Sequence, residues 1–67
     1  MDTYEYWAHE KSGEVWAVHI QDGEVVGACG PLNHRDRPAD MRDFEYSQEE
    51  AAWIEDCRED FRLWEAV

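Results

Sequence analysis

Basic residues are scarce in this chain of 67 residues. Six Lys and Arg stand against 17 Asp and Glu, which gives a formal net charge of −11. A protein that binds nucleic acid through its phosphates needs a positive surface, and an anionic membrane surface repels a chain of this charge. We therefore expect no nucleic-acid and no membrane partner, and we expect any protein partner to be basic.

Long hydrophobic runs are also absent. No apolar stretch approaches the roughly 20 residues that a membrane helix needs. The N-terminal sequence MDTYEYWAHE has neither the basic nor the apolar region of a signal peptide. We expect a soluble, cytoplasmic protein that forms one small domain over residues 1–67, since a chain this short leaves no room for a second.

The first part of the chain has the pattern of a β-meander over residues 4–29. Three apolar-rich runs (4–10, 14–20 and 24–29) are separated by Ser12-Gly13 and Asp22-Gly23, which are signals for tight hairpin turns. Two-residue turns would place Trp7 opposite Val18 and Ile20 opposite Val25. Alternation then gives one face that carries Trp7, Trp16, Val18, Ile20, Val25 and Cys29.

The last part predicts an amphipathic helix over residues 47–65. Ser47 and Glu50 have the spacing of a capping box at its start. One helical face collects Trp53, Ile54, Cys57, Phe61 and Trp64. The predicted fold is α+β, a three-stranded antiparallel meander with this C-terminal helix packed on one face. Its predicted core is Trp7, Trp16, Val18, Ile20, Trp53, Ile54, Phe61 and Trp64.

The connection over residues 30–46 shows no period and holds both prolines. A loop of this length is often functional. We therefore interpret His34, Arg35 and Arg37 as candidate interaction residues. A short extra strand over 44–46 is an alternative for part of this segment.

The second sheet face is too apolar for ordinary contact with solvent, and this suggests a partner. It carries Tyr6, Val15, Ala17, Val26 and Ala28. We expect a homodimer through this face, because so small a domain buries only about 60% of its unfolded surface. The alternatives are a solvated face or a face covered by the 30–46 segment.

Regular acidic side chains mark the outer side of the predicted helix. They are Glu55, Asp56, Glu59 and Asp60. Solvation is the ordinary explanation of such a run. The functional hypothesis is a surface that contacts another protein, and the alternative is an inhibitor that imitates the phosphate charge of nucleic acid and blocks a basic site.

Candidates for catalysis or metal binding are few. Cys29, His34 and Cys57 could contribute to a metal site, but the spacing lacks two close ligand pairs, and a Cys29–Cys57 disulfide does not suit a reducing compartment. We expect both cysteines to pack in the core, and His9 and His19 to be half-buried in the sheet. With no phosphate-binding loop and no nucleophile motif, the sequence predicts a non-enzymatic interaction module without metal or cofactor.

Overall fold

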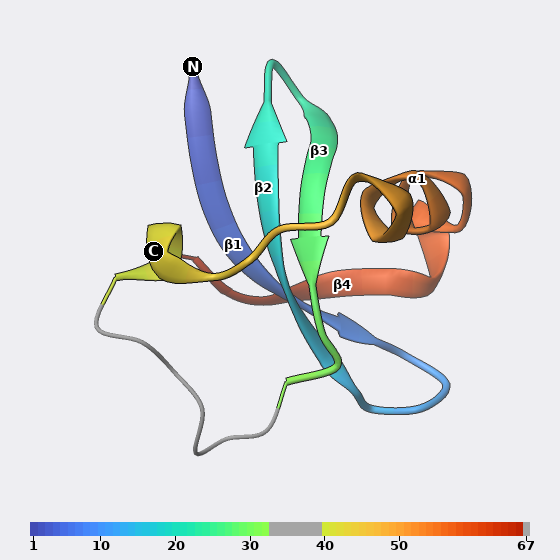
Figure 1. Cartoon of the computed structure of the whole chain (residues 1–67). Helices are drawn as coiled ribbons and strands as arrows, with labels where there is room; N and C mark the ends of the chain where they lie inside the picture. The colour runs from blue at the N-terminus through green and yellow to red at the C-terminus, as the bar shows by residue number, and fades with distance from the viewer. Residues whose placement is uncertain (33–39, 67) are drawn as a thin grey trace.

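The computed structural model describes residues 1–32 and 40–66 and has an α+β fold, as predicted. Its elements are the strands β1 (Asp2–His9), β2 (Val15–Gln21) and β3 (Glu24–Cys29), the 3-10 helix η1 (Met41–Asp43), the helix α1 (Gln48–Asp56), the 3-10 helix η2 (Arg58–Asp60) and the strand β4 (Phe61–Ala66) (Figure 1). All strand pairs are antiparallel, in the order β3-β2-β1-β4. The described sheet therefore has four strands, and the prediction of three was wrong.

The fourth strand arises because the helix is shorter than predicted. α1 starts as expected, with the Ser47 side chain accepting a hydrogen bond from the Glu50 amide at 3.3 Å. It ends at Asp56 rather than at residue 65. Its last turn has two acidic residues, Glu55 and Asp56, and no basic one. Negative charge at the negative end of the helix dipole disfavours further helix, and the chain turns through η2 into β4.

The first hairpin has a different register from the prediction, but the same faces. Trp7 lies opposite Trp16 instead of Val18, because residues 10–14 all lie between the two strands. This shift of two residues keeps every side chain on its predicted face. The second hairpin places Ile20 opposite Val25, as predicted.

A β-bulge between β2 and β3 changes the faces further along β3. The register shifts between His19 and Ile20, so that Val18 lies opposite Ala28. Beyond such an extra residue the alternation along the strand is reversed. Ala28 therefore lies on the helix side, where it is fully buried, and Cys29 lies opposite Ala17 on the other side. The predicted placement of both residues was wrong for this reason.

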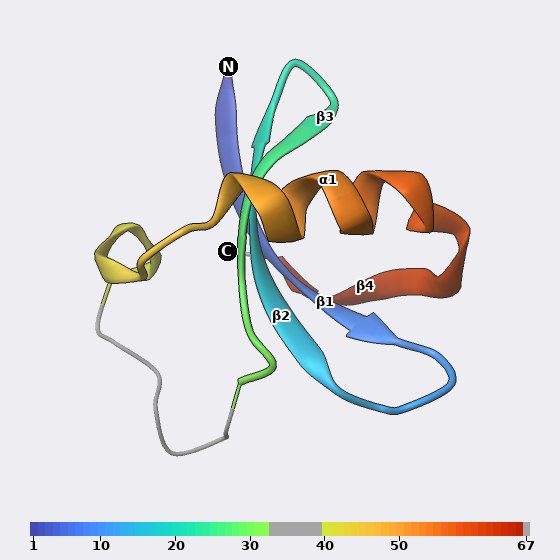
Figure 2. The same cartoon turned by 45° about the vertical axis from the view of Figure 1, so that its right-hand side comes forward.

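The main core lies between the sheet and α1, which packs chiefly against β3. Figure 2 shows the sheet nearly edge-on, with α1 on one side and the 40–46 segment on the other. This core contains Trp7, Trp16, Val18, Ile20, Val25, Ala28, Ala51, Ile54 and Phe61. Two predicted core residues are not in it: Trp53 is 46% exposed and Trp64 is 40% exposed.

Candidate interaction site

The sheet face that was expected to form a dimer is covered by other residues of the same chain. Tyr6 and Ala17 are buried in a second cluster with Met41. The partly buried residues around them are Tyr4, Val15, Leu32, Phe44 and Tyr46. Val26 is half-buried, and Ala28 belongs to the core under the helix. The expectation of an open face does not hold, because the 40–46 segment covers it, which was the alternative.

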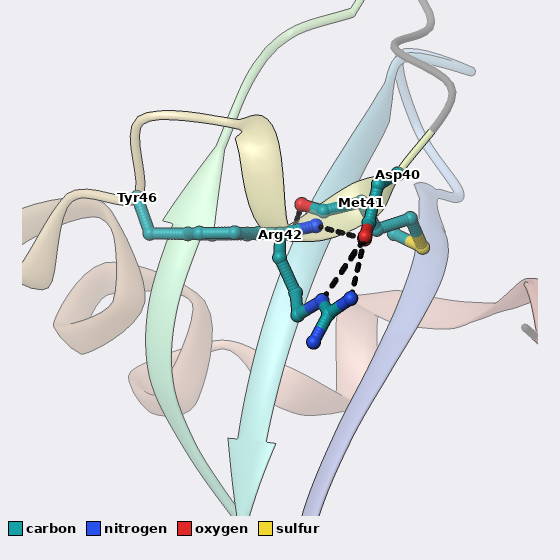
Figure 3. A network of polar contacts seen from close by, with 4 residues as sticks. All are labelled: Asp40, Met41, Arg42 and Tyr46. Atoms are coloured by element: carbon teal, nitrogen blue, oxygen red, sulfur yellow. Dashed lines mark hydrogen bonds and ion pairs between the residues drawn. The ribbon is translucent and has the colours of Figure 1, made fainter.

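Polar contacts fix the fold of this covering segment (Figure 3). Asp40 accepts a hydrogen bond from the Arg42 amide at 3.0 Å and pairs with its guanidinium at 2.7 Å. These hydrogen bonds lower the pKa of Asp40 to about 2. The Tyr46 hydroxyl donates to the Met41 carbonyl oxygen at 2.7 Å, and burial raises the pKa of Tyr46. The segment thereby holds the buried Met41 against the sheet.

The two histidines of the strands lie among aromatic rings and are partly buried. His9 contacts the ring of Phe61 at 5.0 Å between centroids. His19 stacks on Tyr4 at 4.6 Å, and its buried Nε2 atom lies 3.6 Å from an Asp2 carboxylate oxygen, beyond hydrogen-bond distance. Both rings contribute to packing.

The acidic residues predicted for one helical face lie on two different elements. Glu55 and Asp56 end α1, whereas Glu59 and Asp60 belong to η2. Glu55 also has a structural role, because its carboxylate accepts a hydrogen bond from the Val25 amide at 3.0 Å. The regular array of carboxylates on one rigid helix, from which nucleic-acid mimicry was inferred, is therefore absent.

The cysteines lie on opposite sides of the sheet. Cys29 lies on the Ala17 side, and Cys57 packs at the border of the core under α1. Both thiols are free, and burial raises the pKa of each. Within residues 1–32 and 40–66, no group of three or more His, Cys, Asp or Glu could hold a metal ion. The loop candidates lie outside the described residues: His34, Arg35 and Arg37.

The two edges of the sheet differ in how they are protected. Along β3, the Ser47 backbone exchanges two hydrogen bonds with Ala28, and the Glu55 carboxylate binds the Val25 amide. Along β4, no further strand lies beyond the edge in the described part of the chain. This edge also exposes large apolar side chains, because Leu63 is 57% and Trp64 is 40% exposed.

A small hollow lies beside β4 on the helix side of the sheet. It has a volume of about 190 Å³ and is lined by Glu5, Trp7, Arg58, Phe61, Arg62 and Leu63. The Trp7 indole donates to Glu5 at 2.8 Å, and the Arg58 guanidinium lies 5.1 Å from the centre of the Trp7 ring. Arg58 is held there by the Gly23 carbonyl oxygen at 2.7 Å. The hollow thus combines apolar walls with the Arg58 guanidinium and the Glu5 carboxylate.

Comparison with known proteins does not identify a family. No family model matches the chain, and neither a curated protein nor a solved structure matches it. Each of the helices in the described residues is too short or too polar to cross a membrane. The functional inferences therefore depend on the geometry of this chain.

The β4 residues are the part of the candidate site that the sequence interpretation missed. Arg62 and Leu63 were included in the predicted helix without a role, and Trp64 was placed in the core. Phe61 and Leu63 alternate with polar or exposed residues, which is the two-residue period of a strand. This alternation was the available signal, but the longer helical pattern concealed it.

Proposed function

We propose that this protein is a small, acidic, non-enzymatic interaction module that forms a homodimer through the outer edge of β4. One observation carries this proposal: β4 is an edge strand with exposed Leu63 and Trp64, whereas the β3 edge is capped. An exposed apolar edge strand pairs readily with another strand. Two copies related by a two-fold axis would pair β4 with β4 in the antiparallel direction.

Charge makes β4 a more favourable contact surface for a second copy than the rest of this acidic protein. The sequence of β4 contains one basic residue, Arg62, and one acidic residue, Glu65, so the strand is formally neutral in a chain of net charge −11. Pairing at β4 brings together the copies with little local repulsion. The remaining repulsion is screened by salt over a Debye length of about 8 Å at physiological ionic strength.

The size of the hollow supports a binding role over an enzymatic one. Its 190 Å³ is below the roughly 300–1,000 Å³ of typical ligand pockets. Acidic side chains of α1 and η2, such as Asp56 and Glu59, are exposed in the single chain. We infer that this acidic surface is available to a basic protein as a further partner, with attraction that weakens as salt rises.

Sedimentation equilibrium tests the dimer, over a range of protein concentration at low and high salt. The critical variant is Leu63→Lys, because a lysine on an edge strand opposes pairing. The matched control is Ala52→Lys, which adds the same charge at an exposed position of α1. Both variants lower the net negative charge, so general repulsion changes equally.

We expect the native chain and Ala52→Lys to form dimers whose fraction rises with salt. We expect Leu63→Lys to stay monomeric while it keeps its circular dichroism spectrum. A monomeric mass for the native chain at high concentration and high salt would exclude the dimer. Equal dimerisation of the two variants would exclude β4 as the interface.

A further inference from the structure

A β-bulge determines which side chains of β4 share a face. The register of β1 and β4 shifts between Tyr6 and Trp7. Leu63 lies opposite Trp7, on the helix side of the sheet. Glu65 lies opposite Tyr6, so Trp64 is the extra residue of the bulge. Simple alternation would place Glu65 on the same face as Leu63, but the bulge places it on the opposite face, which is the face of Tyr6.

This opposite face of β4 carries a cation, an aromatic ring and a carboxylate. Arg62 lies opposite Ala8, which shares a face with Tyr6 because the two are separated by one residue of the same strand. The Trp64 ring packs edge-on against the Tyr6 ring, at 6.0 Å between centroids. Arg62, Trp64 and Glu65 are all exposed. Groups that attract one another therefore lie along one exposed edge.

Symmetry limits the ways in which β4 can pair with a second β4. A two-fold axis perpendicular to the sheet places one residue directly opposite its own copy, so each register has a central residue. A centre at Arg62 or at Glu65 would bring like charges directly opposite each other, which is destabilising. A centre at either end of the strand would halve the overlap. The remaining centres are Leu63 and Trp64.

We propose that the two copies pair in the register centred on Leu63, and that Arg62 of each copy binds Trp64 and Glu65 of the other. This inference rests on the proposed dimer and specifies its interface. In this register Leu63 meets its own copy on the helix side. On the other face Arg62 lies opposite the bulge of the second copy, where its guanidinium can lie over the indole ring and pair with the carboxylate. A centre at Trp64 would instead place Arg62 opposite the last residue of the strand.

Charge reversal tests this assignment by sedimentation equilibrium at constant ionic strength. Arg62→Glu and Glu65→Arg each place like charges across the interface. We expect each to raise the Kd of the dimer about tenfold, because the pair occurs twice in the dimer. The chain with both reversals restores opposite charges and should dimerise within about twofold of the native chain. Glu65→Arg lowers the net negative charge, so general repulsion alone would predict a tighter dimer.

The matched control for Arg62→Glu is Lys11→Glu, which makes the same change of charge at an exposed turn position. It should raise the Kd by less than about threefold. Equal effects of these two variants, a tighter dimer of Glu65→Arg, or no recovery in the doubly reversed chain would overturn the contact of Arg62 while leaving the dimer in place. A native chain that stays monomeric would show that the bulge protects this edge, and would overturn the dimer as well.

The native chain also reports the register directly, without any variant that could fail to fold. An equal mixture of isotope-labelled and unlabelled chains is used for isotope-filtered NMR, which detects contacts between copies only. We expect a contact between the Arg62 side chain of one copy and the Trp64 ring of the other. A dimeric sample that lacks this contact, or that shows the two Trp64 rings in contact with each other, would overturn the centre at Leu63.

Discussion

Phe61 provides the sharpest test of the fold, because its role depends on β4. As the first residue of that strand it is 8% exposed. Its ring lies 5.6 Å from the ring of Trp16 and 5.6 Å from that of Trp53. A helix continued to residue 65 would bury Trp53 and Phe61 together, whereas the structure leaves Trp53 46% exposed. The long helix predicts similar losses of stability when Trp53 or Phe61 is truncated, whereas the short helix followed by β4 predicts a larger loss for Phe61.

The magnitudes follow from burial. Phe61→Ala removes a buried aromatic ring, which costs about 3–5 kcal/mol. Trp53→Ala removes a side chain that is about half exposed, so its cost is about half of the value for a buried aromatic, roughly 1.5–2.5 kcal/mol. The whole domain has a stability of about 3–10 kcal/mol at the usual value per residue. Phe61→Ala therefore brings the domain to the margin of unfolding.

The assay is urea denaturation followed by far-UV circular dichroism. Phe61→Leu is included because it retains most of the apolar volume and should cost only about 1–2 kcal/mol. We expect Phe61→Ala to lower the free energy of unfolding most. Trp53→Ala should lower it less, and Phe61→Leu should lower it by the same amount as Trp53→Ala or by less. If Trp53→Ala costs as much as Phe61→Ala or more, the short helix followed by β4 is refuted.

Three further results are expected. Gly30→Ala should destabilise the fold by about 1–3 kcal/mol, because a Cβ atom there would lie 2.5 Å from the buried Trp16 ring; unchanged urea stability would contradict this packing. Asp40 has a pKa of about 2 against an ordinary value of 3.8, so its stabilising contribution is complete above pH 4 and is lost as the pH falls through about 2. Carboxyl NMR should show this midpoint, which Arg42→Gln should raise towards 4. Ala17→Glu should unfold the monomer, since Ala17 is 0% exposed; a folded variant would show that the 40–46 segment does not cover this face.

The parts of the fold with local signals could be predicted from the sequence. Asp22-Gly23 predicted the second hairpin, in which both residues adopt positive φ of 51° and 85°. Ser47 and Glu50 predicted the start of α1. Both signals act through neighbouring residues, so no information about distant parts of the chain was needed.

The remaining parts depend on distant contacts. The positions of Phe61 and Trp64 fit both a helix and a strand. The strand forms because this segment pairs with the edge of β1, which is distant in the sequence. The bulge at His19 and Ile20 gives no clear signal in the sequence, yet it exchanges the faces of Ala28 and Cys29. Residue patterns predict which side chains are apolar, but tertiary packing decides what covers them.

The candidate site was missed for the same reason. Leu63 acquires a role only when β4 pairs with β1 and places it opposite Trp7, with Arg62 opposite Ala8. In a helix, Arg62 would be one more exposed charge. In the strand, it lies opposite Ala8 and is also exposed.

Within the described residues, the C-terminal third of the chain protects the β3 edge, and no further strand pairs with the outer edge of β4. Ser47 and Glu55 bind the backbone of β3, so this edge has few free hydrogen-bonding groups. Natural proteins usually protect the opposite edge with lysine, proline or a covering segment, but β4 contains neither lysine nor proline. The exposed Leu63, on an edge strand without these protections, is therefore the feature on which the proposed dimer depends.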